Sequence, residues 1–190
     1  MEIENAFLIH GSFGSPDENW MPWLKRELER KGVEVIAPHF PSGEEQTLKN
    51  WLREFERYRH MMGPKTIMVG HSIGSAFIFR VLERSDVKIL SSFLVAPFSR
   101  PVRISKYDEV NKTFLEKEFD WEKIRKNCGS FHVYGSDNDP YVKFSQEDFV
   151  AKKLEASMRV IEGAGHINEE AGYKEFKELL GDISFLMKED

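Results

Sequence analysis

The chain has 190 residues, of which 41% are hydrophobic and 31% charged, and 27 basic against 32 acidic side chains give a net charge of −5. This length and apolar content predict one globular domain, residues 1–190, that buries about 70% of the surface of the unfolded chain. There is no basic stripe or run of like charges, which argues against nucleic acid or an anionic membrane surface as the main partner. The only cysteine, Cys128, excludes an internal disulfide.

Short apolar segments bounded by Gly or Pro alternate with longer segments of helical periodicity. This alternation is typical of βα units that build a mostly parallel sheet with helices on both faces. Several segments are continuously apolar, as expected for strands that are covered on both sides. Six strands are predicted, at residues 6–10, 34–38, 66–70, 89–96, 131–135 and 158–162.

Helical periodicity predicts a helix with one wet face at 48–62, a helix at 73–82 that is apolar around nearly its whole circumference, and a final helix at 169–187. The apolar helix is expected to lie deep against the sheet, which would hold its N-terminus rigidly. Residues 97–120 interrupt the alternation of strand and helix segments, because polar and charged residues dominate there. At the carboxyl end of a strand, such a segment is either a short lid or pocket wall, or a solvated loop.

The third predicted strand runs through Gly70-His71-Ser72-Ile73-Gly74 into the apolar helix. A G-x-S-x-G sequence between a strand and a helix is typical of a nucleophile elbow, in which a sharp turn projects the serine hydroxyl and the glycines allow close packing. The helix N-terminus behind Ser72 favours negative charge on an attacked carbonyl. The alternative interpretation is a plain tight turn in which Ser72 caps the helix.

A serine nucleophile needs a base that is oriented by an acid. His166 follows the sixth strand in a Gly-Ala-Gly-His loop, and Asp137 and Asp139 follow the fifth. The order Ser, Asp, His is that of the α/β-hydrolases. Asp139 is favoured as the acid because it begins a D-x-x-V pattern, which leaves Asp137 as a turn former. Either carboxylate could reach the histidine.

Acyl transfer also needs two backbone N–H groups at the developing oxyanion. One is expected from Ile73, and the other from Ser12, or alternatively Phe13, in the His-Gly-Ser-Phe-Gly loop after the first strand. His10 and His71 are expected to orient loops through hydrogen bonds. Five aromatic residues near these loops are candidates for an apolar pocket: Phe13, Trp20, Phe98, Trp121 and Tyr141.

The sequence contains no HExxH, CxxC or P-loop pattern, so neither a metal nor another cofactor is expected. The longest apolar stretch, residues 93–98, is far shorter than the roughly 20 residues of a membrane span. The first residues lack the pattern of a secretory signal, and one unpaired cysteine suits a reducing compartment, so a cytoplasmic protein is expected. The oligomeric state stays open.

Beyond these motifs, residues 120–128 and 135–140 strongly resemble the compact serine hydrolases of the retinoblastoma-binding protein 9 and YdeN family, and the similarity spans nearly the whole chain. The resemblance implies a minimal α/β-hydrolase fold with a short lid, and a triad at Ser72, Asp139 and His166. The L-x-C-x-E motif that linked the mammalian member to retinoblastoma protein is absent here, so that partner is not expected.

The resemblance implies hydrolysis of small carboxylic esters or of amino-acid or peptide-like amides through an acyl-enzyme. Two alternatives remain open. A protein-binding module could keep the hydrolase scaffold with little turnover, since fold alone does not ensure activity. Transfer of the acyl group to an alcohol or amine would use the same residues.

Overall fold

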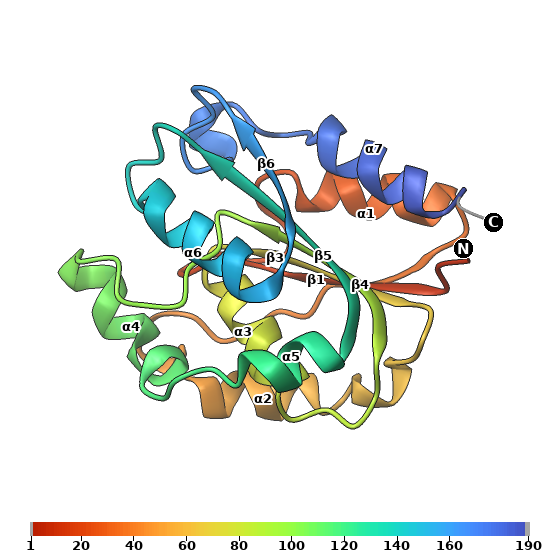
Figure 1. Cartoon of the computed structure of the whole chain (residues 1–190), viewed down its shortest axis with the longest axis horizontal. Helices are drawn as coiled ribbons and strands as arrows, with labels where there is room; N and C mark the ends of the chain where they lie inside the picture. The colour runs from red at the N-terminus through yellow and green to blue at the C-terminus, as the bar shows by residue number, and fades with distance from the viewer. Residues whose placement is uncertain (1, 189–190) are drawn as a thin grey trace.

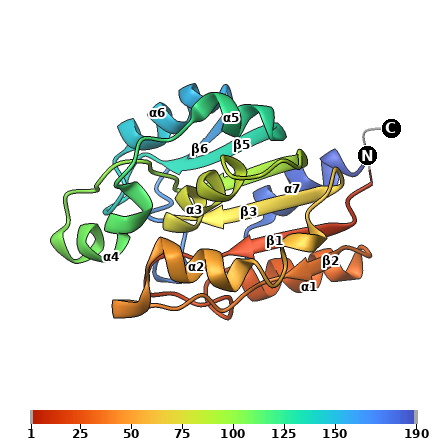
Figure 2. The same cartoon turned by 90° about the horizontal axis from the view of Figure 1, so that it is seen from below.

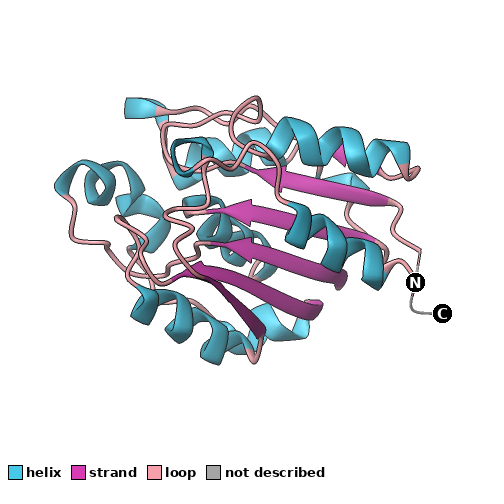
Figure 3. Cartoon of the chain, turned by 90° about the horizontal axis from the view of Figure 1, so that it is seen from above, coloured by secondary structure: helices cyan, strands magenta, loops and turns pink. Residues whose placement is uncertain are grey.

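The computed structural model describes residues 2–188, and its centre is one sheet of six parallel strands in the order β2-β1-β3-β4-β5-β6. All six predicted strands are present, with ends shifted by up to three residues. Figure 3 shows the strands side by side with their arrowheads at one end of the sheet. The strands are β1 (Asn5–Ile9), β2 (Glu34–Ile36), β3 (Thr66–His71), β4 (Ile89–Val95), β5 (Cys128–Ser136) and β6 (Ser157–Ile161).

Helices cover both faces of this sheet. Helices α1 and α7 lie together on one face, and α2, α3, α5 and α6 cover the other (Figures 1 and 2). The fold is therefore the predicted doubly covered parallel sheet. The helices are α1 (Met21–Arg30), α2 (Leu48–Phe55), α3 (Ile73–Leu82), α4 (Ser105–Leu115), α5 (Trp121–Lys126), α6 (Phe144–Leu154) and α7 (Lys177–Leu186).

Strand β3 and helix α3 form the centre of the core. Every residue of both elements is buried, which confirms that the helix after the third strand lies deep in the molecule. Even Arg80 of α3 is 2% exposed, and its Nε donates to the carbonyl of Phe114 at 2.8 Å while its guanidinium lies over the Phe119 ring. Burying each large apolar side chain contributes about 1.5–3 kcal/mol, so the β3–α3 junction is anchored on both sides.

The predicted final helix, 169–187, is wrong at its start. The chain forms a 3₁₀ turn at Glu169–Ala171, and α7 begins only at Lys177. The Asn168 side chain accepts from the N–H of Ala171, and Gly172 then adopts φ 90°, which ends the turn. Phe176 lies within the predicted helix and is fully buried, but it reaches the core from a non-helical segment.

The predicted helix at 48–62 is also too long. Helix α2 ends at Phe55, and a separate 3₁₀ turn follows at Arg59–Met61. Apolar residues at three- and four-residue spacing suit both kinds of helix, so the periodicity continues through the break.

Residues 97–120 are not a solvated loop, because they contain α4. This helix lies beyond the carboxyl ends of the strands, where the arrowheads of β1 and β3 point in Figure 2. Its residues Asn111 and Phe114 are buried, and the Phe114 ring packs against Trp51 of α2 and Phe77 of α3. Within residues 2–188, none of the helices has the length and apolar character needed to cross a bilayer.

Candidate active site

The turn between β3 and α3 places Ser72 in a backbone conformation that is rare for a side-chain-bearing residue. Its φ is 57° and its ψ is −123°. Such a conformation costs about 1–3 kcal/mol and persists only where the surroundings impose it. The buried strand before Ser72 and the buried helix after it supply that constraint.

Two glycines make this sharp turn sterically feasible. A Cβ atom at Gly74 would stand 2.4 Å from the carbonyl oxygen of Ile9, and one at Gly70 would stand 2.8 Å from the backbone nitrogen of Ser75. Contacts below 3.0 Å do not occur for real Cβ atoms. The glycines of the G-x-S-x-G sequence therefore let α3 pack directly against β1 and β3.

The Ser72 side chain does not cap helix α3, which rules out the alternative interpretation of a helix-capping serine. Within residues 2–188 its hydroxyl makes no hydrogen bond. Instead Ser72 lines a pocket of about 180 Å³ at the carboxyl ends of the strands, and His166 lines the same pocket.

His166 is oriented by a carboxylate from the loop after β5. Its Nδ1 lies 2.7 Å from Oδ2 of Asp139, whose side chain is fully buried. Because a carboxylate only accepts, Nδ1 carries a proton, and in the neutral tautomer with this proton it is Nε2 that has the lone pair. The second oxygen of Asp139 accepts from the N–H groups of Tyr141 and Val142 at 2.8 and 3.0 Å, so both oxygens are held.

The other two polar residues of this loop hold the histidine loop instead of the imidazole. Asp137 is exposed and accepts from the N–H of Gly163 at 2.7 Å, and Asn138 accepts from the N–H of Gly165 at the same distance. Asp137 was expected to shape its own turn, whereas its hydrogen bond bridges two loops. The two loops that supply Asp139 and His166 are thus joined by two hydrogen bonds in addition to the one that the imidazole makes.

His71 lies under the histidine loop and orients it. Its Nε2 donates to the carbonyl oxygen of His166 at 2.9 Å, as expected for a loop-orienting residue, although His71 also lines the pocket. Burial, followed by the neighbouring His166, lowers the pKa of His71 to about 3. The ring is therefore neutral at physiological pH and acts as a fixed hydrogen-bond donor.

The loop after β1 forms another part of the pocket lining, beside Ser72. Phe13 has φ 57°, and its N–H donates to Oε1 of Gln46 at 3.0 Å. In the part of the chain that the structure describes, the N–H groups of Ser12 and Ile73 have no hydrogen-bond acceptor. Of the two N–H groups considered for the first-strand loop, that of Phe13 is thus already engaged.

The expected aromatic residues separate into two groups. Phe13, Phe98 and Tyr141 line the pocket, and the Tyr141 ring lies edge-on to His166 at 5.1 Å between centroids. Trp20 and Trp121 do not line it. Trp20 is fully buried in the core on the face that α1 and α7 cover, where its ring contacts Phe176 just before α7.

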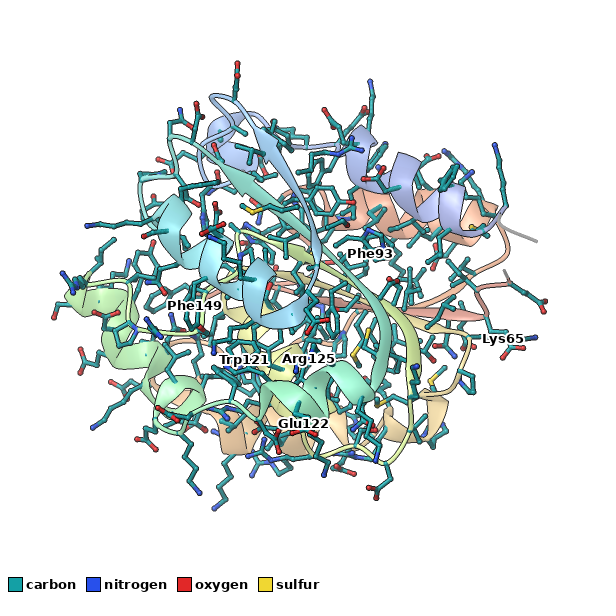
Figure 4. All side chains as sticks on the ribbon, viewed as in Figure 1. Lys65, Phe93, Trp121, Glu122, Arg125 and Phe149 are labelled. Carbon is teal, nitrogen blue, oxygen red and sulfur yellow. The ribbon has the colours of Figure 1, made fainter. Side chains whose placement is uncertain are left out.

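Trp121 lies at the start of α5, where Figure 4 shows it beside Phe149 of α6. Its other ring contacts are with Phe79 and Phe119, on the face of the sheet that α3 covers. The prediction that Trp121 lines the pocket is therefore wrong, because β5 separates it from the loop that carries Asp139.

Sequence reasoning missed several polar residues that line the pocket. The position of Asn111 could have been noticed in the sequence. It has helical spacing from Tyr107 and Phe114 and so lies on their face of α4, where an apolar residue is expected. The remaining polar residues come from turns whose placement no periodicity encodes. They are Glu18, Asn19, Asn168 and Glu170.

A buried carboxyl group was also missed. Glu147 of α6 is fully buried behind the acid loop, where its Oε2 accepts from the N–H of Ser136 at 3.3 Å. Burial, followed by the charge of Asp139, raises the pKa of Glu147 to about 9, so the group is neutral at pH 7. It occupies the space beside Gly135, where a Cβ would meet Oε2 at 2.3 Å.

Residues 2–188 contain no group of three or more His, Cys, Asp or Glu side chains arranged to hold a metal ion.

The chain is similar to known proteins over nearly its whole length. The chain is 28% identical over 173 residues to the putative hydrolase YdeN of Bacillus subtilis, covering 90% of this chain and 89% of YdeN. It is 27% identical over 185 residues to the serine hydrolase RBBP9 of Rattus norvegicus, covering 96% and 95%. The crystal structure of the B. subtilis ydeN product superposes with a TM-score of 0.88 at 26% identity, over 95% of this chain and 97% of that one.

These similarities confirm the expected resemblance, and the sheet order with helices on both faces is the α/β-hydrolase fold. The model of the serine hydrolase family matches residues 6–183. The chain belongs to the serine hydrolase family.

Proposed function

We propose that the protein hydrolyses small carboxylic esters or amino-acid and peptide-like amides through an acyl-enzyme on Ser72, with His166 as the base and Asp139 as the orienting acid. The observation that carries this proposal is the 2.7 Å contact between Asp139 and His166 at the pocket that Ser72 also lines. The strained turn at Ser72 supports it, since strain of this kind gathers at reactive sites.

In this mechanism His166 Nε2 takes the proton of the Ser72 hydroxyl as Oγ forms a bond to the substrate carbonyl carbon. The carbonyl oxygen becomes an oxyanion, for which the N–H groups of Ser12 and Ile73 are the donors. His166 then returns the proton to the leaving alcohol or amine as the carbon–leaving-group bond breaks. Water, activated by the same imidazole, hydrolyses the acyl-enzyme.

The volume and lining of the pocket support small substrates. About 180 Å³ is below the usual 300–1,000 Å³ of sites for drug-sized ligands. Phe13, Phe98 and Tyr141 supply apolar contact for an acyl or side-chain group, beside several polar side chains.

A buried, unpaired Cys128 supports a reducing, cytoplasmic setting.

The test is labelling with a fluorophosphonate probe, with Ser72→Ala as the control. We expect stoichiometric labelling of the native protein and none of the variant. An unlabelled, folded native protein would favour a binding module that keeps the scaffold without turnover. Nitrophenyl esters beside aminoacyl amides then separate the two substrate classes by kcat/KM.

A further inference from the structure

The loop after β1 holds a conformation that its own residues do not explain. Phe13 is a non-glycine residue in the left-handed region, and the residue is 37% exposed, so core packing does not hold it. Within the loop, the N–H of Gly14 donates to the carbonyl of Gly11 at 3.2 Å. His10, directly before the loop, donates from Nδ1 to the same carbonyl at 2.9 Å, and the other support comes from residues far away in the sequence.

Two buried amide side chains reach this loop from different parts of the chain. Gln46, after β2, is 2% exposed, and Asn111, on α4, is 1% exposed. Gln46 Oε1 accepts from the N–H of Phe13, and Gln46 Nε2 donates to Asn111 Oδ1 at 2.8 Å. Asn111 Oδ1 also accepts from the hydroxyl of Ser12 at 2.9 Å.

One backbone group fixes which atoms of this network donate and which accept. Because the N–H of Phe13 can only donate, the Gln46 atom that it meets must be the carbonyl oxygen, and the amide nitrogen must face Asn111. Asn111 must then present its oxygen, to which the Ser12 hydroxyl donates. Each member therefore has a single consistent orientation, and both ends lie on the first-strand loop.

Such a network is stable only when it is complete. Leaving a buried amide without its partner costs more than the net gain from a typical hydrogen bond, because the group has lost water and gained nothing in return. Any movement of the loop that breaks one link leaves buried polar groups unpaired. The network thus favours one conformation of the loop before substrate arrives.

We propose that Asn111 and Gln46 are positioning residues that hold the first-strand loop so that the Ser12 N–H, and not that of Phe13, is the second oxyanion donor. This inference rests on the proposed function and adds the residues that set its oxyanion site. It also makes α4, within residues 97–120, a structural part of that site, since α4 carries Asn111 and its Tyr107 ring contacts the Phe13 ring.

The first test is a set of variants normalised to the number of active sites titrated with the fluorophosphonate. In Asn111→Leu we expect kcat to fall about 10²-fold, as for the loss of one oxyanion donor, with KM within about twofold. The inhibition constant of a boronic acid, which forms a tetrahedral adduct, should rise by the same factor as kcat falls. Gln46→Met should act in the same direction, and the double variant should be no worse than about the stronger single one, because both break one network.

Thr113→Val is the matched control. Thr113 lies on the same helix, and its hydroxyl accepts from the N–H of Leu48 at 2.9 Å, so it also ties α4 to the segment after β2. This bond does not reach the first-strand loop. We expect a lower melting temperature with unchanged kcat per titrated site.

Two results would overturn the proposal: a kcat of Asn111→Leu within about threefold of wild type per titrated site, or an equal loss in Thr113→Val. The second would mean that docking of α4, and not the amide network, matters. A wild-type protein that neither reacts with the fluorophosphonate nor turns over any ester or aminoacyl amide refutes the proposed function instead.

Amide hydrogen exchange tests the network without relying on activity or on a folded variant. In the wild-type protein the Phe13 amide should be protected, and the Ser12 amide should gain protection only when the boronic acid binds. An unprotected Phe13 amide refutes the network itself. Protection gained at Phe13 in place of Ser12 refutes the donor assignment.

Discussion

Two walls of the pocket, which lie side by side, are held in place by different means. On one wall, the turn between β3 and α3 is held by backbone packing, and the glycines at 70 and 74 stand where any Cβ would clash with main-chain atoms. On the other wall, the loop after β1 is held by side chains up to 99 residues away in the sequence. The first wall is encoded locally, whereas the second requires three segments to fold together.

The loops that carry Asp139 and His166 resemble the second wall, since side-chain hydrogen bonds join segments 26–27 residues apart. Steric exclusion therefore places Ser72, and polar contacts place the groups around it. Variants of the two kinds should therefore fail differently, by misfolding or by loss of kcat.

The largest effect is expected from the acid loop. Asp139→Asn should lower kcat about 10⁴-fold with little loss of stability, because the amide favours the wrong imidazole tautomer. Asp137→Asn, which keeps an oxygen for the Gly163 N–H, should change kcat little. Steady-state kinetics on one ester decides it, and the reverse pattern would make Asp137 the acid.

The elbow should fail by misfolding. Gly74→Ala places a Cβ 2.4 Å from the Ile9 carbonyl oxygen, so we expect a loss of about 3 kcal/mol or more in the free energy of unfolding. Gly14→Ala is the matched change on the other wall, where the nearest atom would be 3.3 Å away, and should cost far less. Urea unfolding compares them, and equal losses would contradict the steric account of the elbow.

The buried Glu147 behind the acid loop should make stability depend on pH. Its pKa is raised to about 9 in the folded protein, so stability is complete at acid pH, where both states hold the proton. As pH rises from about 5, the unfolded chain releases its proton and the folded one does not. The unfolding free energy should fall by about 1 kcal/mol per pH unit up to pH 8, relative to Glu147→Gln, which does not titrate. Urea melts of the two proteins at four pH values test this, and parallel curves would contradict the raised pKa.

The smallest effect is expected at the edge of the amide network. Ser12→Ala removes the hydroxyl that donates to Asn111 but keeps the Ser12 backbone N–H, and Asn111 still accepts from Gln46. We expect a loss of about 1 kcal/mol in stability and less than a tenfold fall in kcat. A fall as large as that of Asn111→Leu would show that the hydroxyl itself, and not the loop position, is required.

The amino-acid sequence by itself determined the six strands, the buried α3 and the G-x-S-x-G turn, because alternation of apolar segments and the absence of a Cβ are local properties. The order of the serine, aspartate and histidine along the chain could also be taken from the sequence, because each residue follows a predicted strand. The assignment of the three as a triad stays a prediction.

Only the tertiary structure decided where α7 begins, that Trp20 and Trp121 belong to the core, and that residues 97–120 contain a helix against the pocket. It also brought Gln46 and Asn111 to the loop after β1, and Glu147 under Ser136. The physical reason is that the sequence predicts a polar side chain on a helix or turn to be exposed to solvent. Only long-range packing decides whether that side chain is exposed or is buried against a distant backbone group.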